Sequence, residues 1–175
     1  MNTGIKLSKG KIIGIINSGD IYYPKTLKYV SNYFERFKNL DYLFGPVKKD
    51  RILFRFEPEK IFYRMNIYPS HSGGFFIKSN AQKQVGYYDK TLKFGADHDL
   101  FYKIIVKYKL NGMIAKKSEV FARFDLGGIS SKINFCKTYF YEMKIRYKNG
   151  QNIIYLIILY LLKIINKIFK QIIRI

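Results

Sequence analysis

The chain has 175 residues and a hydrophobic content of 48%, which predicts one folded domain and excludes a disordered tail. Its net charge of +20 indicates an anionic partner: nucleic acid, an anionic membrane surface or a phosphorylated substrate. The single cysteine, Cys136, excludes an internal disulfide and disfavours a metal-thiolate cluster.

The first predicted elements are a strand and a helix. Residues 12–16 form an apolar run that is typical of a strand covered on both faces, as in a parallel sheet. Pro24 suits the first turn of a helix, and Leu27, Val30 and Phe34 follow it at helical spacing. A strand, a polar loop and a helix in this order indicate an α/β fold.

The polar loop consists of Asn17, Ser18, Gly19 and Asp20. Ligands of open α/β sheets bind at the carboxyl ends of strands, and Gly19 would let the backbone come close to one. Asp20 offers the carboxylate that a hard divalent cation prefers, and such a cation could bridge to a diphosphate. Spacing alone favours the alternative, a capping loop that places Asp20 near the N-terminus of the next helix.

Four further strands are predicted in the middle of the chain. Two lie within residues 41–56 around a Lys-Lys-Asp turn, one covers 73–78 and one covers 118–124. A glycine pair at 127–128 ends this region.

Three helices are predicted from apolar spacing. The first covers residues 97–109, and the other two lie near 134–148 and 152–174 with Asn149-Gly150 between them. The apolar stripe of the first helix consists of Leu100, Phe101, Ile104, Ile105 and Tyr108.

A second acidic cluster holds Asp89, Asp97 and Asp99. Helical positions two apart point nearly opposite ways, so Asp97 and Asp99 should not share a face. One of them could face a cleft as a general base while the other caps the helix or faces solvent. The alternative is that both only complement the positive helix N-terminus.

His71 precedes a glycine pair and a predicted strand. It could bind a phosphate or an acceptor hydroxyl, or it could be a hydrogen-bonded structural group. The sequence has no His-x-x-x-His or Cys-x-x-Cys pattern and no P-loop pattern, which disfavours a zinc site and a P-loop nucleotide site.

Three stretches together resemble family 2 glycosyltransferases of the GT-A fold, bacterial enzymes that build surface polysaccharides. They read MNTGIKLSKGKIIGIINSGDIYYP, HSGGFFIKSNAQKQVGYYDKTLKFGADHDLFYKI and FDLGGISS. The resemblance implies an α/β fold with a partial GT-A-like mixed sheet flanked by helices over residues 1–131. Residues 132–175 would follow as a basic, amphipathic helical segment.

The resemblance also implies roles for the acidic residues. The loop Asn17 to Asp20 falls where such enzymes carry an Asp-x-Asp-type metal motif, so Asp20 would bind Mn²⁺ or Mg²⁺ on the diphosphate of a nucleotide-sugar donor. Asp97 would be the catalytic base that deprotonates an acceptor hydroxyl for inverting attack. His71, Asp89 and Asp99 are candidates for the acceptor side.

Family members open with a strand, a loop and an aspartate that hold the nucleotide. Met1 aligns with the middle of that fold, so the resemblance implies a truncated enzyme, completed by a separate N-terminal half or a second copy. The sheet would then have an open edge or a dimer interface. The implied acceptor is a saccharide or a lipid-linked sugar, and a non-catalytic, membrane-associated remnant is the alternative.

The last predicted helix combines apolar and basic residues. Ile153 to Leu162 is an apolar run of ten residues, too short to span a bilayer of about 30 Å. The basic residues that follow fall on one helical face: Lys163, Lys167, Lys170 and Arg174. This pattern predicts a peripheral helix on an anionic membrane surface, at the cytoplasmic face of the inner membrane. The alternative is a helix packed on the domain or on a second copy, and no recognised motif supports nucleic-acid binding.

Overall fold

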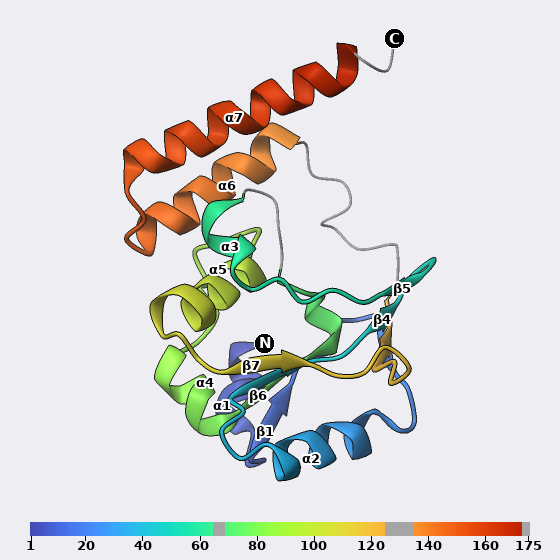
Figure 1. Ribbon diagram of the computed structural model, residues 1–175. Coiled ribbons are helices and arrows are strands. Elements are labelled where there is room, and N and C mark those ends of the chain that lie inside the picture. The colour runs from blue at the N-terminus through green and yellow to red at the C-terminus, as the bar shows by residue number, and fades with distance from the viewer. Residues whose placement is uncertain (65–68, 125–134, 173–175) are drawn as a thin grey trace.

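The computed structural model describes residues 1–64, 69–124 and 135–172. It is a mixed α/β structure with two small sheets, helices around them and a helical pair at one end (Figure 1). The predicted mixed sheet flanked by helices is therefore confirmed. The glycine pair at 127–128 and the expected boundary between residues 131 and 132 lie outside the described residues.

The helices and strands have these bounds. The helices are α1 (Asn2–Leu7), α2 (Thr26–Arg36), α3 (Lys60–Tyr63), the 3₁₀ turn η1 (Ser72–Gly74), α4 (Ser79–Val85), α5 (Ala96–Tyr102), the π-helical η2 (Lys103–Lys107), α6 (Phe135–Lys148) and α7 (Ile153–Ile172). The strands are β1 (Ile12–Gly14), β2 (Ile21–Tyr22), β3 (Tyr42–Phe44), β4 (Val47–Lys48), β5 (Ile52–Leu53), β6 (Phe75–Lys78), β7 (Gly112–Ile114) and β8 (Ala122–Arg123).

The first sheet forms the central layer, in the order β1-β6-β3-β7. Because side chains alternate between the faces of a strand, Phe75 of β6 packs with Phe101 of α5, whereas Phe76 packs in the cluster that holds Val30 and Phe34 of α2. The rings of Phe44, Phe75 and Phe101 interlock with centroids 5.0–5.2 Å apart. This aromatic contact fixes α5 on one face of the sheet.

The strand predicted over 12–16 differs from its expected setting. It is confirmed as β1, but it lies at the end of the sheet order, pairs antiparallel with β6 and buries only Ile13. The expected covered, parallel position is therefore wrong. The apolar run alone does not show which strand it pairs with. The partner, β6, lies far along the chain, and Ile13 pairs with Ile77.

The second sheet has the order β2-β8-β4-β5. The segment 41–56 contributes three strands instead of the two expected, because the chain changes sheet at Gly45 between β3 and β4. A Cβ atom on Gly45 would lie 1.9 Å from the Phe121 ring, so only glycine permits this crossing. The Lys-Lys-Asp turn is confirmed as the connection of the antiparallel pair β4–β5.

Helix α2 confirms the predicted helix with a later start. It begins at Thr26 after Pro24, and the Thr26 hydroxyl donates a hydrogen bond to the Phe121 carbonyl at 2.5 Å. Val30 and Phe34 are buried as predicted, but Leu27 is 66% exposed.

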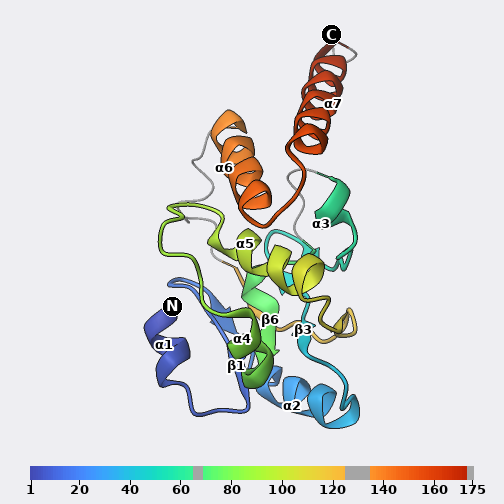
Figure 2. The same ribbon diagram turned by 90° about the vertical axis from the view of Figure 1, so that its left-hand side faces the viewer.

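The C-terminal helices α6 and α7 lie at the end of the molecule farthest from the sheets (Figure 2). They follow the predicted pattern, with Asn149-Gly150 in the turn and Gly150 at φ +88°. Helix α6 packs on α5, and α7 packs on α6. None of the helices in the described part of the chain has the length and apolarity needed to span a membrane.

Arg146 joins α6 to the rest of the structure. Its guanidinium is fully buried and donates to Glu142 Oε1 at 2.6 Å, to the Phe62 carbonyl at 2.8 Å and to the Arg64 carbonyl. Burial, together with the charge of Arg146, lowers the pKa of the adjacent His98 to about 3, so this imidazole is neutral. A buried charge with these partners makes the attachment of α6 specific.

Arg146→Met should lower the free energy of unfolding by about 3–5 kcal/mol, because it leaves the Glu142 carboxylate buried without its guanidinium partner. Urea unfolding at neutral pH measures the loss. Lys144→Met, an exposed charge on the same helix, is the matched control and should change stability by about 0.5 kcal/mol or less. Equal losses in the two variants would contradict the structural role of Arg146.

Candidate functional site

The candidate site is built around the turn η1. His71 precedes it, and its Nδ1 accepts a hydrogen bond from the Gly73 amide at 3.1 Å. The Gly45 amide donates to the Gly74 carbonyl at 2.9 Å, and a Cβ atom on Gly74 would lie 2.2 Å from the Gly45 carbonyl oxygen. The turn is therefore held directly against the point where the chain passes between the two sheets.

Asp20 and His71 meet at Gly73. A Cβ atom on Gly73 would lie 3.6 Å from Asp20 Oδ2 and 3.3 Å from His71 Nδ1, so glycine leaves a space between the two side chains. Burial lowers the pKa of His71, and the charge of Asp20 partly opposes this shift. Because Nδ1 of the neutral ring accepts a hydrogen bond, its proton resides on Nε2, which is a donor.

Asp97 reaches the same turn from the start of α5. Gly95 supplies the positive φ of +77° that begins this helix, and the Asp97 carboxylate forms a side-chain hydrogen bond with Ser72. Burial raises the pKa of Asp97, while the bond from Ser72 opposes the rise. A half-buried carboxylate with a raised pKa is suited to accept a proton.

Two tyrosines link the acidic residues. Burial, reinforced by the charge of Asp20, raises the pKa of Tyr22 to about 12. Burial also raises the pKa of Tyr88, which is near enough to feel Asp97 and Tyr22. Both phenols therefore stay protonated at neutral pH and can donate hydrogen bonds in the site.

Three of the residues singled out in the sequence thus converge at η1: Asp20, His71 and Asp97. Asn17, Ser18 and Gly19 form an exposed turn beside them, in which Gly19 has φ +90° and the Asp20 amide donates to the Asn17 carbonyl. The capping interpretation of this loop is wrong, because β2 intervenes and the N-cap of α2 is Lys25.

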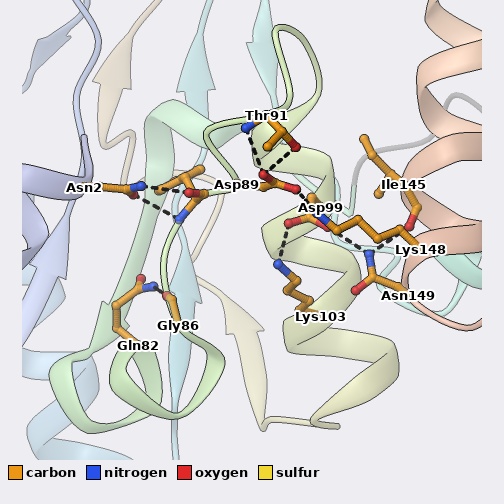
Figure 3. Close-up of polar contacts among 11 residues, drawn as sticks. Asn2, Gln82, Gly86, Asp89, Thr91, Asp99, Lys103, Ile145, Lys148 and Asn149 are labelled. Atoms are coloured by element: carbon orange, nitrogen blue, oxygen red, sulfur yellow. Dashed lines mark hydrogen bonds and ion pairs between the residues drawn. The ribbon is translucent and has the colours of Figure 1, made fainter.

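Asp89 and Asp99 form a separate polar cluster against α6 (Figure 3). Asp89 accepts hydrogen bonds from Thr91 and pairs with Lys148. Asp99 is fully buried and accepts from Lys103 at 2.6 Å and from Asn149 at 2.8 Å. These contacts give both residues a structural role in holding the 86–91 segment and α5 against α6.

The predicted divergence of Asp97 and Asp99 is confirmed. Asp97 contacts Ser72 of η1, whereas Asp99 contacts Asn149 at the end of α6. The expectation that the second acid would cap the helix or face solvent is wrong, because Asp99 is completely buried. The hydrogen bond from Lys148, with those from Thr91, keeps the pKa of Asp89 below its usual range.

Ser72, Tyr22 and Tyr88 were missed in the sequence. Ser72 adjoins His71, so its position beside a candidate residue was the available signal. The tyrosines carried no signal, because nothing local separates them from the other tyrosines among the 16 in the chain.

The residues present fit a divalent cation that is shared with a substrate. Among residues 1–64, 69–124 and 135–172, no group of three or more His, Cys, Asp or Glu side chains could hold a metal ion. Mg²⁺, however, is usually held by one or two carboxylates together with substrate phosphates. Asp20 can supply one such carboxylate, while His71 is oriented as a donor and not as a ligand through Nδ1.

No family model matches the chain. Curated relatives described as uncharacterized glycosyltransferases occur in Methanocaldococcus jannaschii, 27% identical over 125 residues, and in Rickettsia typhi, 26% identical over 121 residues. These matches cover 63% and 60% of the chain but 41% and 37% of the relatives. The chain thus spans about two fifths of the length of the curated relatives it matches.

Solved structures of Staphylococcus aureus TarS share the fold. The 1–349 fragment in complex with UDP-GlcNAc superposes with a TM-score of 0.59 at 15% identity, covering 89% of this chain and 48% of the fragment. The same fragment with UDP gives a TM-score of 0.54 at 14% identity, with 89% and 46% coverage. Together with the curated relatives, this likeness confirms the fold that the three sequence stretches predicted: the chain has a glycosyltransferase fold.

Proposed function

We propose that this chain carries the catalytic centre of a metal-dependent, inverting glycosyltransferase that uses a nucleotide-sugar donor. The observation that carries the proposal is the convergence of Asp20, His71 and Asp97 at η1 from three separate segments. Asp20 offers a carboxylate for the proposed cation, and the raised pKa of Asp97 supports its proposed role as a base.

Asp20 is the proposed ligand for Mn²⁺ or Mg²⁺. The cation would supply positive charge to the diphosphate that leaves the donor sugar. TarS, which shares the fold, is known in complex with UDP-GlcNAc and UDP, and this supports a nucleoside diphosphate as the donor's leaving group. The exposed turn of Asn17, Ser18 and Gly19 would lie against the donor.

Asp97 is the proposed general base. It takes the proton from an acceptor hydroxyl while that oxygen bonds to the anomeric carbon and the bond from this carbon to the diphosphate breaks. Attack opposite to the leaving group inverts the configuration. Ser72 orients the carboxylate, and its hydrogen bond opposes the rise of the Asp97 pKa.

His71 is proposed to donate from Nε2 to a diphosphate oxygen or to the acceptor hydroxyl. Its neutral form, favoured by burial, avoids competition with the metal ion for Asp20. The acceptor proposed here is a saccharide or a lipid-linked sugar, which supplies the hydroxyl that Asp97 requires.

Mn²⁺ together with UDP should raise the melting temperature of the chain, measured together with the nucleotide-holding half that the sequence resemblance implies, because both ligands bind the folded state. At a hundredfold excess over the dissociation constant the rise should be about 5–10 °C. Asp20→Asn should abolish the part that depends on Mn²⁺, whereas Asp50→Asn in the exposed β4–β5 turn should leave it intact. Differential scanning fluorimetry measures the melting temperatures of both variants. If Mn²⁺ raised the melting temperature of Asp20→Asn as much as that of the unmodified chain, Asp20 would not be the metal ligand.

The two glycines of η1 should respond differently to alanine. Gly74→Ala should lower the free energy of unfolding by about 1–3 kcal/mol, because its Cβ atom overlaps the Gly45 carbonyl. Gly73→Ala should change stability by about 1 kcal/mol or less, yet weaken UDP and Mn²⁺ binding, because its methyl group fills the space between Asp20 and His71. Calorimetric titration with unchanged affinity in Gly73→Ala would exclude this space as the ligand site.

Ser72→Ala should raise the pKa of Asp97 further, because it removes the hydrogen bond to the ionised form. Carboxyl NMR titration would measure this shift, with Asp97→Asn used to assign the resonance and Ser31→Ala on α2 as the control. The acidic limb of the transfer rate should move to higher pH by the same amount.

Asp97→Asn should also increase stability at neutral pH while it abolishes transfer. The sign follows from the raised pKa: ionised Asp97 disfavours the folded state, and this cost disappears when pH falls through the pKa. A variant that loses stability together with activity would instead mark Asp97 as a structural residue.

A further inference from the structure

Helix α7 exposes a continuous apolar face. Ile154, Ile158, Leu161, Ile165 and Ile168 follow one another at steps of four, three, four and three, which places them on one side of the helix. Each of these side chains is between 49% and 66% exposed. Isolated exposed apolar residues are ordinary, but a row of this length along one helix is typical of a binding surface.

The opposite side of α7 is already occupied by the protein. Leu156 is completely buried, Tyr155 stacks on Phe62 with ring centroids 5.7 Å apart, and Tyr160 meets Tyr139 of α6 at 6.2 Å. The packed side therefore attaches the helix to α3 and α6. The side chains of the exposed row take no part in this packing.

The C-terminal part of the chain, which includes this row, is basic. From residue 126 onward the sequence has nine Lys and Arg but one acid, Glu142, which is buried against Arg146. Helix α6 exposes Lys137 and Lys144 together with Phe140 and Tyr147. The side chains of Lys167 and Lys170 and the whole of Arg174 lie outside the described residues, so the expected basic face of α7 is described only at the half-buried Lys163.

We propose that the exposed apolar row of α7 lies in the interface of an anionic lipid bilayer. Apolar side chains would enter the boundary between headgroups and acyl chains, to a depth of about 5–10 Å, while nearby lysines contact anionic headgroups. A second copy of the chain fits less well, because pairing would bring together two molecules of charge +20. The anionic leaflet at the cytoplasmic face of the inner membrane has the required chemistry.

This inference does not depend on the proposed transferase activity. It would, however, fix the proposed catalytic site relative to the bilayer, because Asn149, in the turn between α6 and α7, donates a hydrogen bond to Asp99 of α5, the helix that also carries Asp97. A lipid-linked acceptor in the bilayer would then meet the proposed catalytic site in one fixed orientation.

A fluorescence experiment tests the insertion directly, since the chain contains no Trp. Ile158→Trp places a reporter on the row, and Leu27→Trp places one on the exposed side of α2. With vesicles of phosphatidylcholine and phosphatidylglycerol in equal amounts, the first reporter should shift to shorter wavelength and be quenched by brominated acyl chains. The second should not respond, and an unchanged Ile158→Trp spectrum would overturn the proposal.

Flotation with the same vesicles provides the second measurement. Replacing Ile154, Leu161 and Ile165 by Gln should weaken binding by about tenfold or more, whereas replacing the exposed Leu27, Ile52 and Phe54 by Gln should not. High salt and pure phosphatidylcholine should also weaken binding of the unmodified chain. Equal flotation of the two triple variants would refute the membrane proposal. It would also be refuted if the unmodified chain did not bind vesicles but sedimented as a dimer, and the first triple variant sedimented as a monomer. The thermal response to UDP and Mn²⁺ should be the same in both triple variants, so failure here is separable from failure of the proposed function.

Discussion

The close contact of Gly45 with Gly74 is the constraint on which the candidate site depends. Here two backbones touch without a side chain between them, at the point where one strand ends in the central sheet and the next begins in the second sheet. This contact holds η1 at the boundary of the two sheets. The loop before β2 and the start of α5 reach the same boundary, so residues distant in sequence share one small volume. The geometry of the candidate site thus rests on this backbone packing.

A second group of polar contacts connects this volume to the helical end. Asp99 and Arg146 are both fully buried, and each is hydrogen-bonded beyond its own helix: Asp99 accepts from Asn149, and Arg146 donates to the Phe62 carbonyl of α3. Removing such groups from water is costly, so they favour one arrangement of α5 and α6 over near alternatives. Asp97 precedes Asp99 by two positions and shares its helix. The contacts on one side of α5 consequently help to define where the carboxylate on the other side lies.

The sequence was informative where the pattern is local. The stripe of Leu100, Phe101 and Ile104 correctly predicted a helix at this place, although the structure divides the predicted range 97–109 into α5 and the π-helical η2, which ends at Lys107. Asn149-Gly150 correctly predicted the turn between α6 and α7. Helical geometry alone separated Asp97 from Asp99. The resemblance to known enzymes brought Asp20 and Asp97 to attention, although neither composition nor spacing joined them to Ser72 or Tyr88.

The errors came from contacts between distant segments. Residues 12–16 look like a central strand. In the structure, β1 instead lies at the edge of the sheet, where it pairs with β6. The second sheet consists of two-residue strands, too short to show a period, and it exists because β8 aligns β2 and β4. The scarcity of acids in this chain drew attention to Asp89 and Asp99, but the sequence did not reveal that Asp89 pairs with Lys148 of α6 or that Asp99 pairs with Lys103 of η2.

The pairing of β2 with β8 has a consequence for how the molecule folds. Ile21 pairs with Arg123, and the central sheet likewise joins β1 to β6 across many intervening residues. Contacts of such long sequence separation require costly loop closure and slow the folding reaction. During synthesis, which proceeds from the N-terminus, the segment that holds Asp20 must wait for most of the chain before its sheet can close. The loop that carries Asp20 therefore reaches its final position only after β8 has been synthesised.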